Sequence, residues 1–381
     1  MSDTPWTYTF YDMRTREELA VLPLTGVSYT RAIRGVGGLN ASLDLGPDKT
    51  RKLNPWRATR GRRTALYVEY GEDMVWGGPV TFRERSDTSE VMSISGVTWE
   101  GWLHRQRLMS TIPLQRLPLP FALRLLLVNA QQVTNVGLEL FDYIRGGITF
   151  PGGDLWNRLE DVGPYPAEEV KPVLELMEEY PTSVDREAEF AIRPRRNATT
   201  GRVELPMMVG IPTLGRRYED TGLNFSWPQG DLLHWKLVED GSGADNVMPL
   251  LGAGSGPTQP FETIRDQDAG VDELASGYPS WMRDYRAQDV DDELALRRRG
   301  VAEMRTGLAS EYVFTGVEVN PTAYIGRVDP GDDVGLQITS KALEEWPAAV
   351  TTITRVLGES VTVGDGGAGD SVKLTVGGVA A

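Results

Sequence analysis

The sequence of 381 residues contains no cysteine and only two histidines, His104 and His234. Without cysteine there is no disulfide, no thiolate nucleophile and no thiolate metal ligand. Two histidines exclude a three-histidine metal site. Because His104 lies among arginines and His234 lies beside Trp235 in a strand-like run, we expect packing or surface histidines rather than a general base.

Positive charge is also scarce, since 39 Lys and Arg face 54 Asp and Glu, giving a formal net charge of −15. A protein that binds nucleic acid phosphates needs a basic face, so this balance argues against such a role.

Long hydrophobic runs are lacking too. The longest run, Phe121–Val128, carries Arg124 and is too short to span a bilayer. The amino terminus "MSDTPWTYTFYD" does not have the pattern of a signal peptide. We therefore expect synthesis in a cytoplasm and no membrane segment.

What the chain does have is ample core material, with 40% hydrophobic residues, 10 Trp and 13 Tyr. Residues 7–110 read mostly as strands, with turn signals between them. Apolar residues at helical spacing predict helices near 99–108, 118–133, 166–183 and 289–309. Strand patterns return between and after the last two helices. The predicted layout is mainly β with α insertions, not the regular alternation of a doubly wound sheet.

One hairpin, "ALYVEY-GED-MVWGG", has the clearest local pattern. Gly71-Glu72-Asp73 is predicted to turn the chain, and Trp76 to pack on one face of the returning strand. Gly77 and Gly78 allow a bulge or a close approach of another backbone. Pro79 removes a ladder donor, as at an edge or bulge. The sequence predicts a scaffold element here, and Gly77→Val is expected to damage folding or assembly.

No motif carries a convincing active site. "LLGAGSG" (250–256) lacks the Lys-Ser/Thr ending and the following helix of a phosphate loop, and "GDGGAGD" (364–370) lacks the ligands of a calcium loop. Paired acids leave a glycosidase open as a weak alternative. Arginine clusters at 60–63, 193–196 and 297–299 are interpreted as solvated or internally paired. We predict no catalytic, cofactor-binding or metal-binding residue.

Five phrases together resemble the tail hub (minor tail) proteins of long-tailed phages, which are related in fold to the hub of contractile-tail baseplates. They are "YVEYGEDMVWGGPVTFRER", "VMSISGVTWEGWLHRQRL", "ADNVMPLLGAGSG", "DDELALRRRGVAEM", and "YIGRVDPGDDVGLQI" followed by "ITRVLGESVTV…DSVKLTV". Their order along most of the chain carries the resemblance. The last phrase includes a turn at Pro330, Gly331 and Asp332, which the resemblance assigns to a closing barrel.

The resemblance implies an α+β fold of two interleaved small antiparallel β-barrels with helical and loop insertions. The expected parts are 5–108 with about 214–252 for the first barrel, 109–171 for a loop and helix insertion, 172–213 with 308–381 for the second barrel, and 253–307 for a linker and helical connection.

The function implied by the resemblance is a structural virion protein without enzymatic activity. It is a homotrimeric hub at the tail tip that joins the distal tail ring and tube to the tip around the DNA channel. Implied partners are further copies of itself, the distal tail ring, the tape measure protein and other tail-tip proteins or fibres, with DNA only in transit. The sequence ends soon after its last strand, so we expect no receptor-binding or wall-degrading extension. A distal tail or carbohydrate-binding tip protein is the alternative, and a wall-degrading enzyme is a further one.

Overall fold

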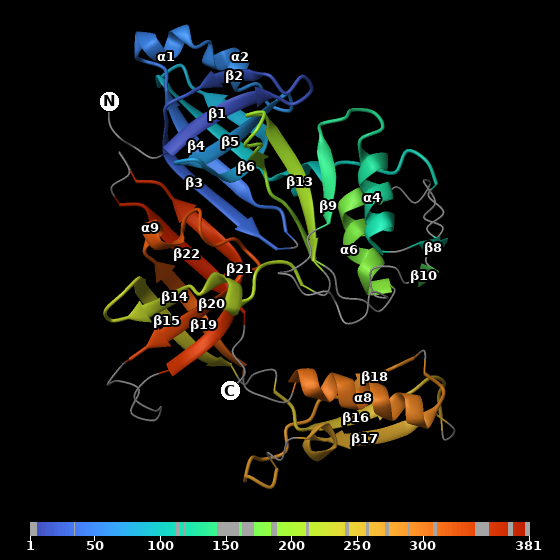
Figure 1. The fold of residues 1–381 in the computed structure, drawn as a ribbon. Helices are drawn as coiled ribbons and strands as arrows, with labels where there is room; N and C mark the ends of the chain where they lie inside the picture. The colour runs from blue at the N-terminus through green and yellow to red at the C-terminus, as the bar shows by residue number, and fades with distance from the viewer. Residues whose placement is uncertain are drawn as a thin grey trace. The chain divides into compact units, whose positions relative to one another are not determined.

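The chain folds mainly into antiparallel β-sheet with a few helices, as predicted from its strand patterns (Figure 1). The computed structural model describes residues 6–33, 35–111, 115–117, 119–142, 160–161, 171–183, 189–210, 213–240, 244–256, 259–270, 274–288, 290–307, 311–339, 350–364 and 369–377. Much of the loop and helix insertion predicted over residues 109–171, including 143–159 and 162–170, lies outside these ranges. Within them, no helix has the length and apolar character needed to cross a bilayer.

The chain divides into two compact units. The first comprises residues up to Trp235 together with Gly316–Gly377, and the second comprises Lys236–Thr315. The strands β15 and β19 contain the points where the chain passes from one unit to the other.

The first unit is built on one long sheet with the strand order β15-β19-β22-β21-β3-β4-β7-β6-β5-β1-β2, and β14 and β20 extend it beside β21. Its N-terminal strands are β1 (Trp6–Asp12), β2 (Glu18–Val21), β3 (Leu24–Ala32), β4 (Gly38–Asp44), β5 (Thr64–Tyr70), β6 (Asp73–Arg85) and β7 (Val91–Val97). Its later strands are β14 (Asn224–Trp227), β15 (Leu232–Asp240), β19 (Glu311–Val319), β20 (Asp333–Ile338), β21 (Val350–Thr362) and β22 (Ser371–Val376). The antiparallel pair β3–β21 joins the two groups of strands.

The strand pairing differs in two places from the grouping expected from sequence. The strand β14 pairs in parallel with β20, so residues near 224 belong with the C-terminal strands rather than with 5–108. The strands at 189–210 pair with one another and with β9 (Leu138–Asp142) rather than with the C-terminal strands. The division into two closed barrels itself stays a prediction.

A second layer covers the outer face of β1 and β5. It contains α4 (Leu119–Ala130), α6 (Val173–Ser183), β9, β11 (Glu189–Ile192), β12 (Arg195–Arg196) and β13 (Val203–Gly210), near the short pair β8 (Gln115–Leu117) and β10 (Glu160–Asp161). In α4 the apolar residues recur at helical spacing and are buried: Ala122, Leu123, Leu126, Leu127 and Ala130. They share one core cluster with Tyr11 of β1 and with Ala65 and Tyr67 of β5. Because Leu66 and Val68 are buried on the other side, β5 is covered on both faces.

Short helices lie at the ends of strands in the first unit. They are α1 (Asp48–Lys52), α2 (Pro55–Ala58), α3 (Trp99–Leu103), α7 (Tyr218–Thr221) and α9 (Pro321–Tyr324). The helix α9 begins with an N-cap, since the Asn320 side chain accepts a hydrogen bond from the backbone N–H of Thr322. Pro321 occupies its first turn, where a missing N–H costs nothing.

The second unit is a small sheet covered by one helix. The sheet has the order β17-β16-β18, and the elements are β16 (Val247–Leu251), β17 (Phe261–Arg265), η2 (Asp266–Ala269), β18 (Tyr285–Arg286) and α8 (Glu293–Gly307). Gly300 lets α8 approach the sheet, because a Cβ at this position would meet the side chains of Leu250 and Ile264. Residues of the predicted linker and helical connection, 253–307, thus share a core with Met248 and Leu250 of β16, which were expected in the first barrel.

Candidate functional site

The hairpin singled out by the sequence is formed by β5 and β6. Tyr70 faces Asp73 across the turn, so Gly71 and Glu72 are the two turn residues, and Gly71 has a φ of +62°. The register between the strands shifts at Val75, which is the extra residue of a bulge. Trp76 follows with only 1% of its surface exposed. The bulge therefore lies just before the two glycines rather than at them.

Gly77 and Gly78 are positions of close approach. A Cβ on Gly78 would lie 1.8 Å from the carbonyl oxygen of Val97, and a Cβ on Gly77 would lie 2.9 Å from Cγ of Pro194. Pro79 is the last residue of β6 that pairs with β5, and from Val80 onward the strand pairs with β7. The glycines and the proline thus stand where β6 changes partner and another backbone crosses it.

The second predicted group, Pro330, Gly331 and Asp332, forms a turn just before β20. Gly331 has a φ of +109° and its N–H donates to the carbonyl of Val356 at 2.6 Å. Asp332 is 1% exposed and accepts hydrogen bonds from the backbone N–H of Arg216 at 2.7 Å and from its guanidinium at 2.6 Å. The turn is therefore a well-anchored part of the first unit, but closure of a barrel by it remains a prediction.

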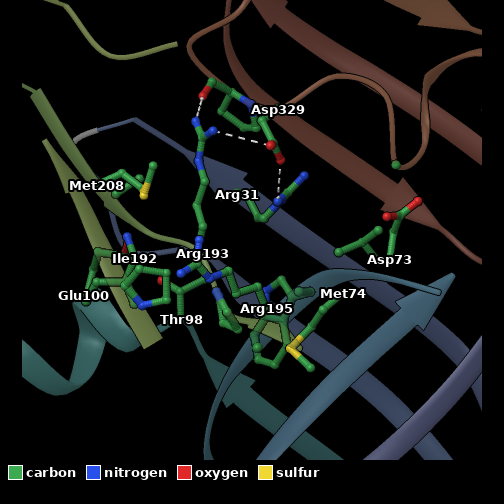
Figure 2. Close-up of a pocket in the computed structure, with 18 of the residues that line it drawn as sticks. Arg31, Asp73, Met74, Thr98, Glu100, Ile192, Arg193, Arg195, Met208 and Asp329 are labelled. Carbon is green, nitrogen blue, oxygen red and sulfur yellow. Dashed lines mark hydrogen bonds and ion pairs between the residues drawn. The ribbon is translucent and has the colours of Figure 1, made fainter. Parts of the chain in front are cut away.

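The structure brings members of the two groups, Trp76 and Gly77 from the first and Pro330 from the second, to one pocket in the first unit, with a volume of about 370 Å³ (Figure 2). Residues 72–77 of the hairpin line one part, and Asp329 and Pro330 line another. The strands β11 and β13 complete the lining through residues such as Ile192 and Met208, and Glu100 of α3 lies next to them (Figure 2). The sequence quoted both groups separately, and only the fold places them at one site.

The pocket is bordered by a chain of charged groups. The carboxylate of Asp329 accepts hydrogen bonds from Arg31 at 2.9 Å and from Arg193 at 3.2 Å. Arg193 also donates to the carbonyl of Pro330 at 2.5 Å. Burial alone would raise the pKa of Asp329, but Arg193 and Arg31 hold that pKa at about 2. This carboxylate is therefore ionised at any physiological pH.

The same network extends into the core. Arg31 donates to Glu359 of β21 at 2.7 Å, and Tyr324 donates its hydroxyl to the other oxygen of Glu359 at 2.6 Å. Burial raises the pKa of the Tyr324 phenol well above its usual range, and the Glu359 carboxylate adds to that effect. Glu359 is 4% exposed, so its charge depends on these two partners.

Two further groups tie neighbouring segments to the pocket. Arg355 of β21 pairs with Glu189 of β11 and donates to the carbonyl oxygen of Gly331 at 3.1 Å. Glu100, 5% exposed, accepts a hydrogen bond from the N–H of Ile192 at 2.6 Å. Burial raises the pKa of Glu100, an effect that the Ile192 N–H opposes.

The arginine cluster at 193–196 is internally paired, as one of the sequence interpretations held. Arg193 pairs with Asp329, Arg195 with Glu204 and Arg196 with Glu69. Cations already matched by carboxylates are poor sites for a further anion. The cluster is thus part of the scaffold.

The described residues hold no group of three or more His, Asp or Glu side chains suited to a metal ion. Both histidines are exposed: His104 borders a second, larger pocket, and His234 lies on β15. The residues that line the first pocket offer mainly ion pairs and hydrogen bonds, among them one between the hydroxyl of Thr98 and the buried carboxylate of Glu100.

Sequence reasoning missed the partners of this network. The contacting residues are far apart in the chain, since Arg31 and Glu359 are separated by 328 positions. A local signal did exist at Asp329, because the run "DPGDD" is dense in acids beside a turn. Nothing in that run indicates which arginines neutralise it.

Comparison with known proteins gives structural matches only. No protein-family model matches the chain, and no curated protein sequence is significantly similar to it. Among solved structures, the 43 kDa tail protein of prophage MuSo2 from Shewanella oneidensis is similar with a TM-score of 0.61 and 10% identity, covering 97% of each chain. A tail protein from Neisseria meningitidis MC58 has a TM-score of 0.55 and 12% identity, covering 97% of this chain and 96% of the other. The prophage tail protein gp18 from Listeria monocytogenes EGD-e has a TM-score of 0.51 and 10% identity, covering 97% and 94%.

These likenesses extend over nearly the whole of both chains. The identities are low, so what the proteins share is the fold. The chain has the fold of phage tail proteins, and the resemblance drawn from its sequence phrases is confirmed at that level.

Proposed function

We propose that the chain is a structural subunit of a phage-type tail: a homotrimeric hub at the tail tip, joining the distal tail ring and tube to the tip around the DNA channel. The observation that carries this proposal is the fold, which matches proteins described as tail proteins over 97% of this chain and 94–97% of theirs. Proposed partners are further copies of itself, the distal tail ring, the tape measure protein and other tail-tip proteins or fibres.

The candidate site supports a role without catalysis. Its charged groups are matched within the protein, and their contacts join segments that are distant in sequence. Such a network fixes the geometry of a scaffold. It commits these charged groups to one another rather than to a substrate.

The net charge of −15 supports a position around passing DNA. Non-specific affinity for DNA comes mainly from cations that displace counterions, and a net acidic wall repels phosphates instead. A channel subunit of this composition lets DNA slide rather than bind.

The test is the oligomeric state and place of the protein. The purified chain should be a trimer by analytical ultracentrifugation, and virions that carry it should show a threefold density at the tail tip. A stable monomer, or a sixfold ring of this chain, would refute the hub. Saccharide affinity together with a sixfold ring would favour a distal tail or carbohydrate-binding tip protein, and clearing of host cell walls in zymography would favour an enzyme.

A further inference from the structure

One loop of the second unit, residues 277–283, exposes an unusual amount of apolar surface; we call it the aromatic loop. The exposed fractions are 59% for Tyr278, 62% for Trp281 and 67% for Met282. Single exposed apolar residues are ordinary, but three large ones within five positions form a cluster of the residue types enriched in interface cores.

Another exposed tryptophan of the chain is already accounted for. Trp56 is 59% exposed, and the guanidinium of Arg83 lies 3.7 Å from the centroid of its ring. Such a cation–π contact stabilises an exposed indole within its own chain. Across the described ranges, the Trp281 ring has no aromatic or cationic partner of this kind.

The backbone of the aromatic loop is held by buried polar groups. Asn246, 1% exposed, accepts a hydrogen bond from the N–H of Trp281 at 2.8 Å and donates its amide to the carbonyl of Pro279 at 3.0 Å. The N–H groups of Asn246 and Val247 both donate to the carbonyl of Trp281, at 3.1 and 3.0 Å. The carboxylate of Asp245 accepts from Arg283 at 3.2 Å.

These contacts fix the loop while its large side chains point out of the core of their unit. An anchored loop loses little conformational entropy when it binds, and this is what distinguishes a binding element from a frayed segment.

The first unit contains a pocket with apolar lining residues that could receive the apolar side chains of the loop; we call it the apolar pocket. Its volume is about 820 Å³, and its apolar lining consists of Met13, Val36, Pro79, Val80, Val97 and Trp102. This size lies in the range of sites that enclose a ligand of several rings. Val36 is 47% exposed, so part of the apolar lining is open to solvent.

We propose that the aromatic loop of one copy inserts into the apolar pocket of a neighbouring copy. A contact between two different surfaces of the same chain is heterologous, and such contacts close into a ring when the rotation between copies allows it. The inference rests on the proposed homotrimer and names the surfaces that would form it.

Charge and area agree with this occupant. Asp284 follows the loop with 76% of its side chain exposed and forms only a long, solvent-exposed ion pair with Arg286 at 4.0 Å, whereas Arg62 and Arg105 border the apolar pocket. The charge of Arg283 is matched by Asp245 within its own unit.

The exposed area of the loop is also sufficient for the centre of an interface. At roughly 150–250 Å² per large side chain, three side chains about 60% exposed supply about 350 Å². That is nearly half of the roughly 800 Å² that each partner gives to a stable interface, so the loop forms its centre.

The absence of cysteine makes a clean test possible. Two single variants, Val36→Cys and Met282→Cys, are purified separately, mixed, and oxidised under mild conditions. We expect a covalent dimer of one chain of each variant, identified by mass spectrometry of the linked peptides. Phe82→Cys, at a position 52% exposed on β6, replaces Val36→Cys as the matched control and should give at least tenfold less product with Met282→Cys.

A second measurement does not depend on crosslinking. Trp281→Ala should weaken self-association by about 30-fold or more, as expected for a central interface anchor. The control is Phe261→Ala, because Phe261 is similarly exposed, at 58%, in the same unit; this variant should leave self-association within about threefold of wild type.

If the wild-type chain is a trimer but the mixed variants do not crosslink, the loop–pocket contact is refuted and the hub proposal stands. If a Val36→Cys/Met282→Cys double variant links only within single chains, the contact is likewise refuted. If the wild-type chain is a monomer, the hub proposal itself fails.

Discussion

The sharpest prediction concerns Gly78, because the obstacle to any side chain there is backbone. A Cβ on Gly78 would lie 1.8 Å from the carbonyl oxygen of Val97, 2.8 Å from its carbonyl carbon and 2.9 Å from Cα of Thr98. Real Cβ atoms keep more than 3 Å from such atoms. Gly78→Ala therefore requires β6 to move by more than 1 Å relative to the end of β7, where α3 begins.

The expected cost follows from that geometry. Overpacking a well-filled interior usually lowers the free energy of unfolding by about 1–3 kcal/mol. The upper part of this range applies here, because the obstacle is backbone rather than a flexible side chain that could move aside. We expect Gly78→Ala to lower the free energy of unfolding by about 3 kcal/mol. The first unit has about 300 residues, so at roughly 2.1 cal/mol/K of unfolding entropy per residue this corresponds to a decrease in Tm of about 5 °C.

The assay is urea and thermal unfolding followed by circular dichroism, with Gly38→Ala as the matched control. Gly38 is also a strand glycine opposite Val97, but a Cβ there meets only the carbonyl oxygen of Gly96, at 3.9 Å. The control should therefore stay within about 1 kcal/mol of wild type, in either direction. If both variants unfold at the same urea concentration, the close approach of β6 and β7 is not what requires Gly78.

Three further changes test the same site. Gly77→Val should destabilise the protein by about 2–3 kcal/mol and reduce assembly, because its Cβ would lie 2.4 Å from the buried ring of Tyr67; a stable, trimeric variant would contradict this. Tyr324→Phe should cost roughly 1.5–3 kcal/mol in urea unfolding, since it removes a hydrogen bond to the buried carboxylate of Glu359; an unchanged midpoint would contradict this. The pKa of Asp329 is lowered from 3.8 to about 2, so its contribution is fully present above pH 4 and is lost as the pH falls toward 2. That shift corresponds to at most about 2.4 kcal/mol, reduced to about 1 kcal/mol because the side chain is 38% exposed, and Asp329→Asn should remove this part of the acid dependence without changing the rest.

Local elements were predictable from the sequence because their signals are local. The hairpin over 67–85, the helix from 119 and the helix from 173 lie where spacing and turn residues predicted them. The exact position of the bulge was not predictable. Val75 became the extra residue because β5 pairs with residues on both sides of it, and that register depends on the whole strand pair rather than on the glycines that follow.

Long-range partners were beyond the sequence for a physical reason. The parallel pair β14–β20 joins Phe225 to Leu336, and nothing in the alternation of either strand specifies the other. The same holds for the ion pair between Arg355 and Glu189, because 54 acids offer many equivalent partners. The acidic and arginine-rich runs were visible, but their pairing follows from topology and not from spacing.

The pairing bears on the proposed position around DNA, because an acidic chain whose arginines are matched internally offers few cations to phosphates. Arg31, Arg193 and Arg216 are each committed to a carboxylate within the first unit. Each such pair removes one cation and one anion from the groups available to a ligand. With 39 basic against 54 acidic residues, each pair leaves the net charge of −15 unchanged but raises the ratio of acidic to basic groups among those that stay unpaired, which disfavours the binding of a polyanion. Exposed apolar side chains such as Trp281 are then the groups through which the proposed contacts with further copies would form.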